Sequence, residues 1–116
     1  MEFAVSRDGT ALVTLQGGSD TTACDDATAD FTSTLESLEA DGTVVDWTID
    51  EAEIYEHPSG PFDPYTIAVE FAVTVIVDAG DADEAAEVGA DTIDDTLERA
   101  DIDAVSYTSA PAASAA

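Results

Sequence analysis

His57 is the residue whose type is best suited to chemistry, because it is the single histidine among 116 residues. Glu56 precedes it, and Asp63 follows a few residues later. An imidazole and two carboxylates can together ligate a divalent metal. The chain has no His-x-x-x-His or Glu-x-x-His spacing, however, and carboxylates are common throughout it. We therefore expect an exposed loop histidine, with Glu56, His57 and Asp63 as weak candidate metal ligands.

Cys24, the single cysteine, is the other candidate for chemistry. It stands near the expected start of a helix, where the helix dipole lowers the pKa of a thiol and could activate a nucleophile. Cys24 also begins an apolar stripe, and no second cysteine or assured histidine partner is present. We expect it to pack in the core. One cysteine excludes an internal disulfide and agrees with a reducing cytosol.

Two further motifs are typical of ordinary structure. Gly17-Gly18-Ser19 precedes a helix, and such junctions bind phosphates, but it lacks the further glycines of a dinucleotide site and the Lys of a P-loop. The pairs Asp25-Asp26 and Asp94-Asp95 are adjacent on helices and do not face each other. We expect a plain turn at the first motif and solvated surface at the others, with no catalytic residue and no cofactor.

The charge of the chain excludes whole classes of partner. It has 27 Asp and Glu residues against two Arg and no Lys, for a net charge of −25. A nucleic acid or an anionic membrane requires a cluster of cations, which two arginines cannot make. The longest apolar run, within 65–77, is too short for the roughly 20 residues that span a bilayer, and the start Met1-Glu2 is unlike a signal peptide. We expect no nucleic-acid partner and no membrane association.

This composition resembles that of cytosolic proteins from salt-in halophilic archaea, which replace Lys by Asp and Glu and favour Ala, Thr and Val. The resemblance extends over the whole chain, is compositional, and matches no named family. It implies a small acidic protein of haloarchaeal type in a cytoplasm with molar salt. At that salt the Debye length is about 3 Å, so repulsion among surface carboxylates is largely screened.

The first element has two alternatives. Residues 2–16 have the composition of a strand, with Asp8-Gly9 in the middle. A two-residue hairpin at Asp8-Gly9 would place Val13 and Leu15 on the wrong face. One long strand, bulged or bent near Gly9, keeps the apolar side chains on one side. We favour the long strand and keep the hairpin as the alternative.

The spacing of apolar residues predicts two amphipathic helices. One runs from about 20 to 40, capped by Ser19 or Asp20 and followed by Gly42. The other begins after Asp81, which forms a capping box with Glu84. Their apolar stripes are Cys24, Ala27, Phe31, Leu35 and Leu38 in the first helix, and Ala82, Ala86, Gly89 or Ala90, Ile93, Leu97 and Ala100 in the second.

Three more strands are indicated by period-two alternation, over 43–55, 65–77 and 102–108. In the first of these the alternation changes phase between Ile49 and Ala52, which predicts a bulge near Asp50-Glu51. Residues 57–64 contain three Pro and one Gly and are expected to form a loop. The strand over 65–77 has the clearest alternation and is expected at the centre of a sheet.

The order β-α-β-β-α-β resembles the ferredoxin-like α+β sandwich. The resemblance implies a four-stranded antiparallel sheet with two helices on one face and the first and third strands in the centre. We expect one domain over residues 1–108 and a disordered tail over 109–116. Many functions use this fold, so none follows from the resemblance.

Function is predicted from the face of the sheet that the helices leave free. The outward positions of the third strand are nearly uncharged, whereas 17 of the 27 acidic residues lie in or beside the helices. We expect a non-enzymatic cytoplasmic module that forms a homodimer, or binds a protein partner, through this face. A small-molecule binding module is the alternative, and a small enzyme is the third. The predicted interface residues are Thr66, Ala68, Ala72, Thr74 and Ile76.

Overall fold

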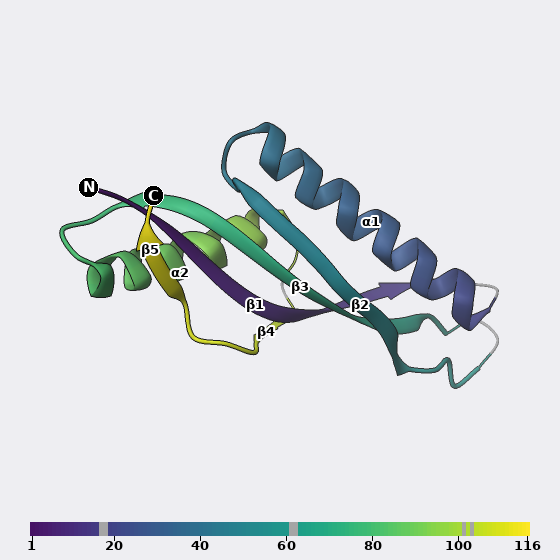
Figure 1. The fold of residues 1–116 in the computed structure, drawn as a ribbon. Helices are drawn as coiled ribbons and strands as arrows, with labels where there is room; N and C mark the ends of the chain where they lie inside the picture. Colours follow the sequence, from purple (N-terminus) through teal and green to yellow (C-terminus); the bar gives the residue numbers. More distant parts are fainter. Residues whose placement is uncertain (17–18, 61–62, 101, 103) are drawn as a thin grey trace.

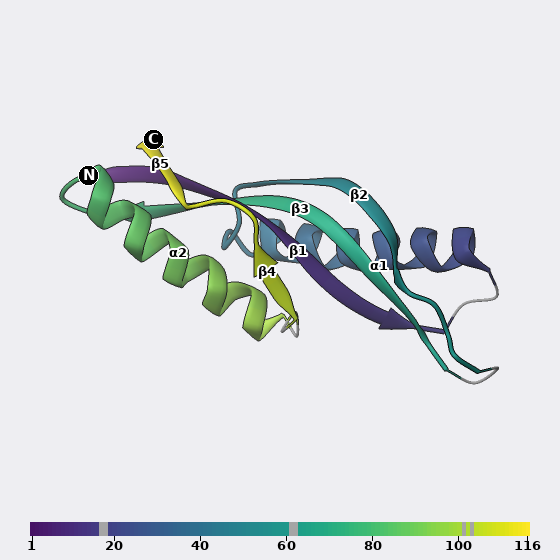
Figure 2. The same ribbon diagram turned by 90° about the horizontal axis from the view of Figure 1, so that it is seen from below.

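A computed structural model describes residues 1–116 except for 17–18, 61–62, 101 and 103. In chain order the elements are β1 (Glu2–Leu15), α1 (Asp20–Ala40), β2 (Asp46–Glu56), β3 (Tyr65–Asp78), α2 (Ala82–Arg99), β4 (Val105–Tyr107) and β5 (Ala112–Ala115). They form an α+β fold in which one open antiparallel sheet carries two helices (Figure 1). The molecule is elongated, 54 × 25 × 21 Å, and the helices lie over opposite ends of the sheet (Figure 2).

The first strand, β1, pairs with β3 along its whole length, from Glu2 opposite Asp78 to Leu15 opposite Tyr65. The prediction of one long strand is confirmed, and the hairpin alternative is wrong. The pairing shows no register shift at Gly9, so the expected bulge is absent from this ladder. A Cβ at Gly9 would lie 3.1 Å from Cζ of Phe71. Gly9 therefore gives room for an aromatic ring on the neighbouring strand and does not form a turn.

The edge strand β2 contains the predicted bulge. Its register with β3 shifts between Ile49 and Glu51, and again between Ile54 and Glu56. The extra residue keeps the apolar residues on both sides of the bulge facing the helices. The alternation predicted over 43–55 implies that Val45 faces the core with Trp47 and Ile49, but Val44 is buried and Val45 is 46% exposed. Val44 follows the turn that ends α1, so its orientation is set by that turn and not by the strand alternation.

The sheet has five strands where we expected four, in the order β2-β3-β1-β4, with β5 also paired to β1. Strand β4 is short and covers β1 only from Gly9 to Ala11. This leaves the first half of β1 with an open edge, and β5 pairs there from Phe3 to Ser6. The expectation of a disordered tail over 109–116 relied on its small residues and did not consider this free edge.

The helix ends follow the sequence signals. The hydroxyl of Ser19 accepts a hydrogen bond from the backbone N–H of Thr22, and the Asp81 carboxylate accepts one from Glu84 N–H at 2.8 Å. Gly42 follows α1 with a φ of 82°, a conformation that glycine adopts without strain. Near the start of each helix, the buried stripe is offset by one residue from the predicted stripe. Ala23 is fully buried in α1 while Cys24 is half-buried, and Ala85 is fully buried in α2 in place of Ala82 and Ala86.

Both helices pack on one face of the sheet, called the inner face here. The rings of Phe31 in α1 and Phe71 in β3 lie 5.1 Å apart. Gly89 of α2 packs directly against Val5, which is paired with Val75 on the same side of β3 as Phe71. The core consists of these side chains and their neighbours. Neither helix in the described part of the chain is long and apolar enough to cross a membrane.

Candidate functional site

The opposite face of the sheet, the outer face, carries the predicted interface residues. Thr66, Ala72 and Thr74 are half-buried, Ile76 is 39% exposed, and Ala68 is buried between its neighbours. The hydroxyls of Ser6 and Thr74 share a hydrogen bond of 2.7 Å between strands. The uncharged outer-face residues of the two central strands are called the neutral patch: Ala4, Ser6, Thr10, Leu12 and Thr14 of β1 with Thr66, Ala68, Ala72, Thr74 and Ile76 of β3.

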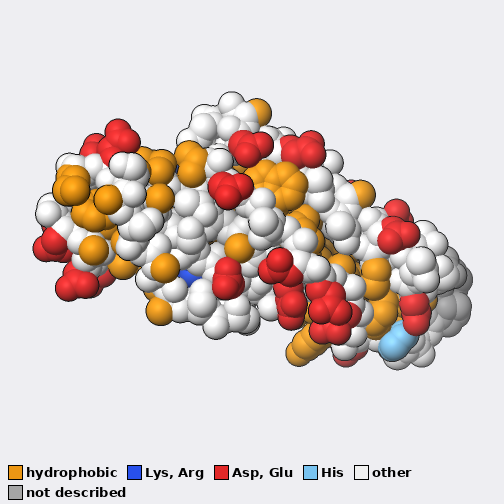
Figure 3. All heavy atoms as spheres, in the orientation of Figure 1, with side chains coloured by type: hydrophobic (Ala, Val, Ile, Leu, Met, Phe, Trp, Pro, Cys, Tyr) orange, Lys and Arg blue, Asp and Glu red, His pale blue; other side chains and the backbone are white. Residues whose placement is uncertain are grey.

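The neutral patch has an acidic border that the sequence analysis did not identify. On β2 the outward residues include Asp46, Glu51 and Glu53, all exposed. Glu51 lies directly opposite Glu70, the one carboxylate in the middle of β3. Figure 3 shows the side of the molecule on which the strands lie in front of α2. On this side, individual carboxylates are scattered among apolar and uncharged side chains. The neutral surface is therefore limited to the central strands and β5.

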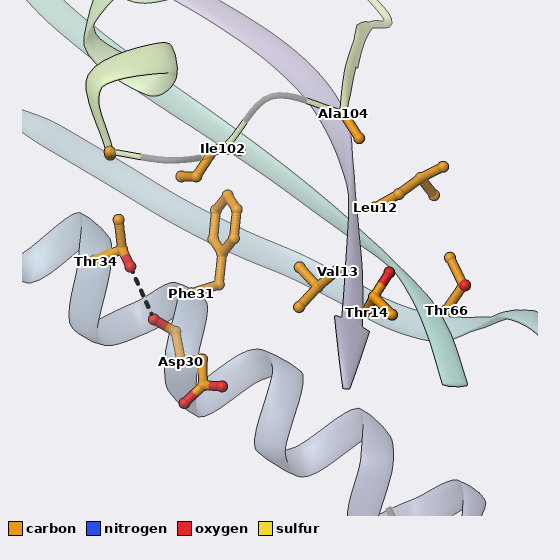
Figure 4. Close-up of a pocket in the computed structure, with 10 residues that line it drawn as sticks. Leu12, Val13, Thr14, Asp30, Phe31, Thr34, Thr66, Ile102 and Ala104 are labelled. Carbon is orange, nitrogen blue, oxygen red and sulfur yellow. Dashed lines mark hydrogen bonds between the residues drawn. The ribbon is translucent and has the colours of Figure 1, made fainter. Parts of the chain in front are cut away.

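A pocket with a volume of about 510 Å³ lies at the end of β1, between α1 and the segment that follows α2. Figure 4 shows Phe31 of α1 and Ile102 facing each other on one side of β1, with Leu12 and Thr66 on its other side. Asp30 and Thr34 of α1 line it as well. The pocket is mainly apolar, has hydroxyl groups and one carboxylate at its rim, and combines segments far apart in the sequence. Periodicity alone could not have predicted it.

The weak metal candidates Glu56, His57 and Asp63 line one small hollow at the end of β2 but do not form a ligand set. His57 is exposed, and its Nε2 lies 3.2 Å from a carboxylate oxygen of Asp20 at the start of α1. Asp63 accepts a hydrogen bond of 2.6 Å from the Ser59 hydroxyl. Among the residues that the structure describes, no cluster of three or more His, Cys, Asp or Glu side chains could hold a metal. His57 therefore links the loop that follows β2 to the start of α1.

The Cys24 thiol is unsuited to nucleophilic chemistry. Its pKa is raised by burial first, and then by the negative charges of Asp20, Asp25 and Glu53. A raised pKa keeps the thiol protonated at neutral pH, which is the opposite of an activated nucleophile. Cys24 packs against the core, as expected. Gly17 and Gly18, the phosphate-binding candidate, lie outside the described residues, and Ser19 beside them serves as a helix cap.

A polar cluster on the inner face was not predicted from the sequence. The Arg7 guanidinium lies 4.0 Å from the ring centre of Tyr107, and its Nε donates to the backbone oxygen of Ser109 at 3.0 Å. The Tyr107 hydroxyl donates to Asp94 of α2 at 3.2 Å. Burial raises the pKa of Tyr107 to about 12, Asp94 adds to the shift, and Arg7 opposes it. Arg7, one of the two arginines of the chain, therefore links β1 to β4 and to the segment that follows it.

Comparison with known proteins finds no relative. No family model, curated protein or solved structure matches this chain. The function must therefore be inferred from the neutral patch, the pocket and the charge distribution themselves.

Proposed function

We propose that this protein is a non-enzymatic, cytoplasmic module of ferredoxin-like architecture that associates with a second copy of itself through the neutral patch. Support for the architecture comes from the central position of β1 and β3 between β2 and β4, with both helices on one face. Strand β5 is an addition to that plan. It extends the uncharged outer face by Ala112 and Ser114, which pair with Ser6 and Ala4.

The contrast between strongly acidic helices and a sheet centre with two outer-face carboxylates, Asp8 and Glu70, carries the proposal. Seven of the 27 acidic residues lie between Asp20 and Asp41, and ten lie between Asp78 and Asp101. Within the neutral patch Leu12 and Ile76 are more than a third exposed. A chain that places carboxylates on most of its surface has only Asp8 and Glu70 among the residues of this area. Burial against the same area of a second copy gives that pattern a physical reason, because a two-fold interface pairs a patch with itself.

The proposal includes a salt-rich cytoplasm. At low ionic strength a net charge of −25 on 116 residues opposes compaction, and molar salt screens that repulsion. We expect the far-ultraviolet dichroism of the protein to lose its helical signal on dialysis into dilute buffer and to recover it in molar KCl. A spectrum and a thermal midpoint that are the same at both salt concentrations would contradict this part. We also expect no specific affinity for DNA or RNA.

The experiment that tests self-association is sedimentation in molar KCl. At a protein concentration of about 100 μM, contacts stronger than about 5 kcal/mol give a dimer. The double variant Ala72→Asp with Thr74→Asp should be monomeric, because each interface would contain four added carboxylates. Ile76→Asp tests the same face without removing the Ser6–Thr74 hydrogen bond.

The matched control adds the same charge elsewhere. Ala29→Asp with Ser33→Asp places two carboxylates on the exposed face of α1 and should leave the dimer intact. Dichroism in the same buffer establishes that each variant is folded. A wild-type protein that sediments as a monomer, or a control that dissociates together with the patch variants, would overturn the proposal.

The pocket favours a small-molecule binding module as the second candidate function. Its volume of about 510 Å³ is within the range of ligand sites, and its lining combines apolar walls with a few polar groups. Native mass spectrometry of protein purified in high salt separates the candidates, since it reports oligomer size and retained ligand together. A monomer that carries a bound metabolite would favour this second function.

A further inference from the structure

One edge of β1 is only partly covered. On the side away from β3, it pairs with β5 along Phe3–Ser6 and with β4 along Gly9–Ala11. The Leu12 N–H donates to the carbonyl of Ala104 at 2.9 Å, which ends this coverage. Beyond Leu12 no strand formed by the described residues pairs with this edge. Among the residues that the structure describes, the last three of β1, from Val13 to Leu15, therefore have a strand on one side only.

The backbone of Thr14 is directed to this open edge. Asp8 accepts a hydrogen bond through its carbonyl from Thr108 N–H, and Leu12 donates to Ala104, both on this side. Alternate residues of a strand direct their N–H and C=O to the same neighbour. Thr14 is the next residue in the series Asp8, Thr10, Leu12. Its N–H and C=O have the orientation that an added strand requires.

The pocket surrounds the same edge on both faces of the sheet. Val13, Phe31 and Ile102 line it on the inner face, whereas Leu12, Thr14 and Thr66 belong to the outer face (Figure 4). A compact ligand needs a hollow on one side of a sheet only. An added strand projects its side chains alternately to both sides, and strand addition gains affinity from the main chain and specificity from such pockets.

Charge decides which strand can be added. Asp30 lines the pocket and is exposed, and the chain has 27 acidic residues against two arginines. Apart from Arg7 of β1, the described strands of a second copy have no Lys or Arg to place beside Asp30, whereas a cationic peptide has, and charges in contact are screened by salt less than distant ones. We propose that the open edge at Val13–Leu15, with its pocket, binds an extended cationic peptide that has alternating apolar residues. This binding does not require self-association, but Leu12, Thr14 and Thr66 belong to both the pocket and the neutral patch, so a dimer would compete with the peptide.

The test uses a capped synthetic peptide, Lys-Val-Thr-Val-Thr-Val-Lys, and isotope-labelled protein at the lowest salt at which dichroism shows the fold intact. We expect chemical-shift changes centred on Val13, Thr14, Leu15 and Phe31. Hydrogen exchange of the Thr14 amide should slow about tenfold when the free peptide is about ten times its dissociation constant, because only the peptide-free form exchanges. Absence of shifts at these residues in folded protein would overturn the proposal.

Two controls separate strand addition from general attraction of cations. The first is a peptide of the same composition in the order Lys-Lys-Val-Val-Val-Thr-Thr, which should bind at least severalfold more weakly. The second is a pair of protein variants: Asp30→Asn should weaken binding severalfold, and Asp83→Asn, at the exposed start of α2, should not. Equal binding of both peptides, or equal effects of both variants, would show nonspecific attraction and overturn the proposal.

The same measurements keep this inference separate from self-association. The Ala72→Asp, Thr74→Asp variant leaves the pocket residues unchanged, so it should still bind the peptide even where it sediments as a monomer. If the wild type is a monomer and the peptide binds, only the self-association proposal fails. If the wild type is a dimer and the peptide causes no shift at Thr14 even in the folded, monomeric Ala72→Asp, Thr74→Asp variant, only the strand-addition proposal fails.

Discussion

The two faces of β3 differ in side-chain size, although their residues alternate along one strand. On the inner face Val69, Phe71, Val73 and Val75 are at most 1% exposed. On the outer face the residues between them are small or polar, and Ile76 is 39% exposed. Apolar burial stabilises in proportion to the area removed from water. The inner face therefore supplies most of the stability of the sheet, and the outer face can be changed with little effect on folding.

The largest expected effect comes from Phe71→Ala. This change removes the ring that packs on Phe31 and against Gly9, and it should lower the free energy of unfolding by about 3–5 kcal/mol. Ile76→Ala, on the outer face of the same strand, should cost less than about 1 kcal/mol in monomeric protein. Chemical denaturation in molar KCl measures both values. Similar losses for the two variants would contradict the division between faces.

Gly89→Ala tests how closely the inner face is packed. A Cβ at Gly89 would overlap the side chain of Val5, so α2 would have to move away from β1. Such overpacking should lower the free energy of unfolding by about 1–3 kcal/mol. At Gly80, a Cβ would meet only the end of the Glu84 side chain, at 3.4 Å. Gly80→Ala is the matched control and should leave the thermal midpoint nearly unchanged; equal midpoints for both variants would refute close packing at Gly89.

On the outer face the electrostatic effect should be smaller and should depend on salt. Glu51 and Glu70 are directly opposite each other, and like charges in that position are destabilising. Glu70→Gln should stabilise the fold by about 0.5 kcal/mol at the lowest salt concentration at which the protein is folded, and the gain should vanish in molar KCl. Glu53→Gln is the control, because Glu53 faces Ala68. A gain that persists in molar KCl would mean that charge is not its cause.

Tyr107 is a polar residue on the inner face, and the ionisation of its phenol should make the stability of the fold depend on pH. Its pKa is raised from 10.0 to about 12, so the folded protein holds the neutral phenol more strongly than the unfolded chain does. This contribution to stability is fully present below pH 10 and is lost as the pH rises through about 12. Thermal midpoints of wild type and Tyr107→Phe should converge across that interval. Midpoints that stay equally separated at every pH would contradict a role for the phenol proton.

Local patterns predicted the parts of the fold that local forces decide. Alternation identified the inner face of β3, the phase change at Ile49 marked the bulge of β2, and Ser19 and Asp81 cap the helices as expected. The hairpin alternative was wrong, although glycine next to Asp is typical of a hairpin turn. A glycine is found at position 9 because the ring of Phe71, on a strand distant in sequence, packs against it.

The remaining features depend on which segments meet. Strand β5 forms because β4 is too short to cover β1, and nothing in the composition of residues 112–115 indicates this. The residues of the neutral patch were predicted by alternation, but its acidic border was not, because that requires the register of β2. The pocket and the contacts of Arg7 with Tyr107 each join segments separated by most of the chain.

The pairing of β1 also has a consequence for the order of folding. Strands β2 and β3 are joined by one short loop, so their hairpin closes at little entropic cost. Every partner of β1 is remote, since Leu15 pairs with Tyr65 and Phe3 pairs with Ala115. The central strand β1 is therefore expected to be added after the hairpin, with one edge paired to β3 and the other edge covered in part by β4 and β5. The amides of Glu53 and Ala68, which are directed to each other across the hairpin, should then be protected before that of Val5 in pulse-labelled hydrogen exchange during refolding.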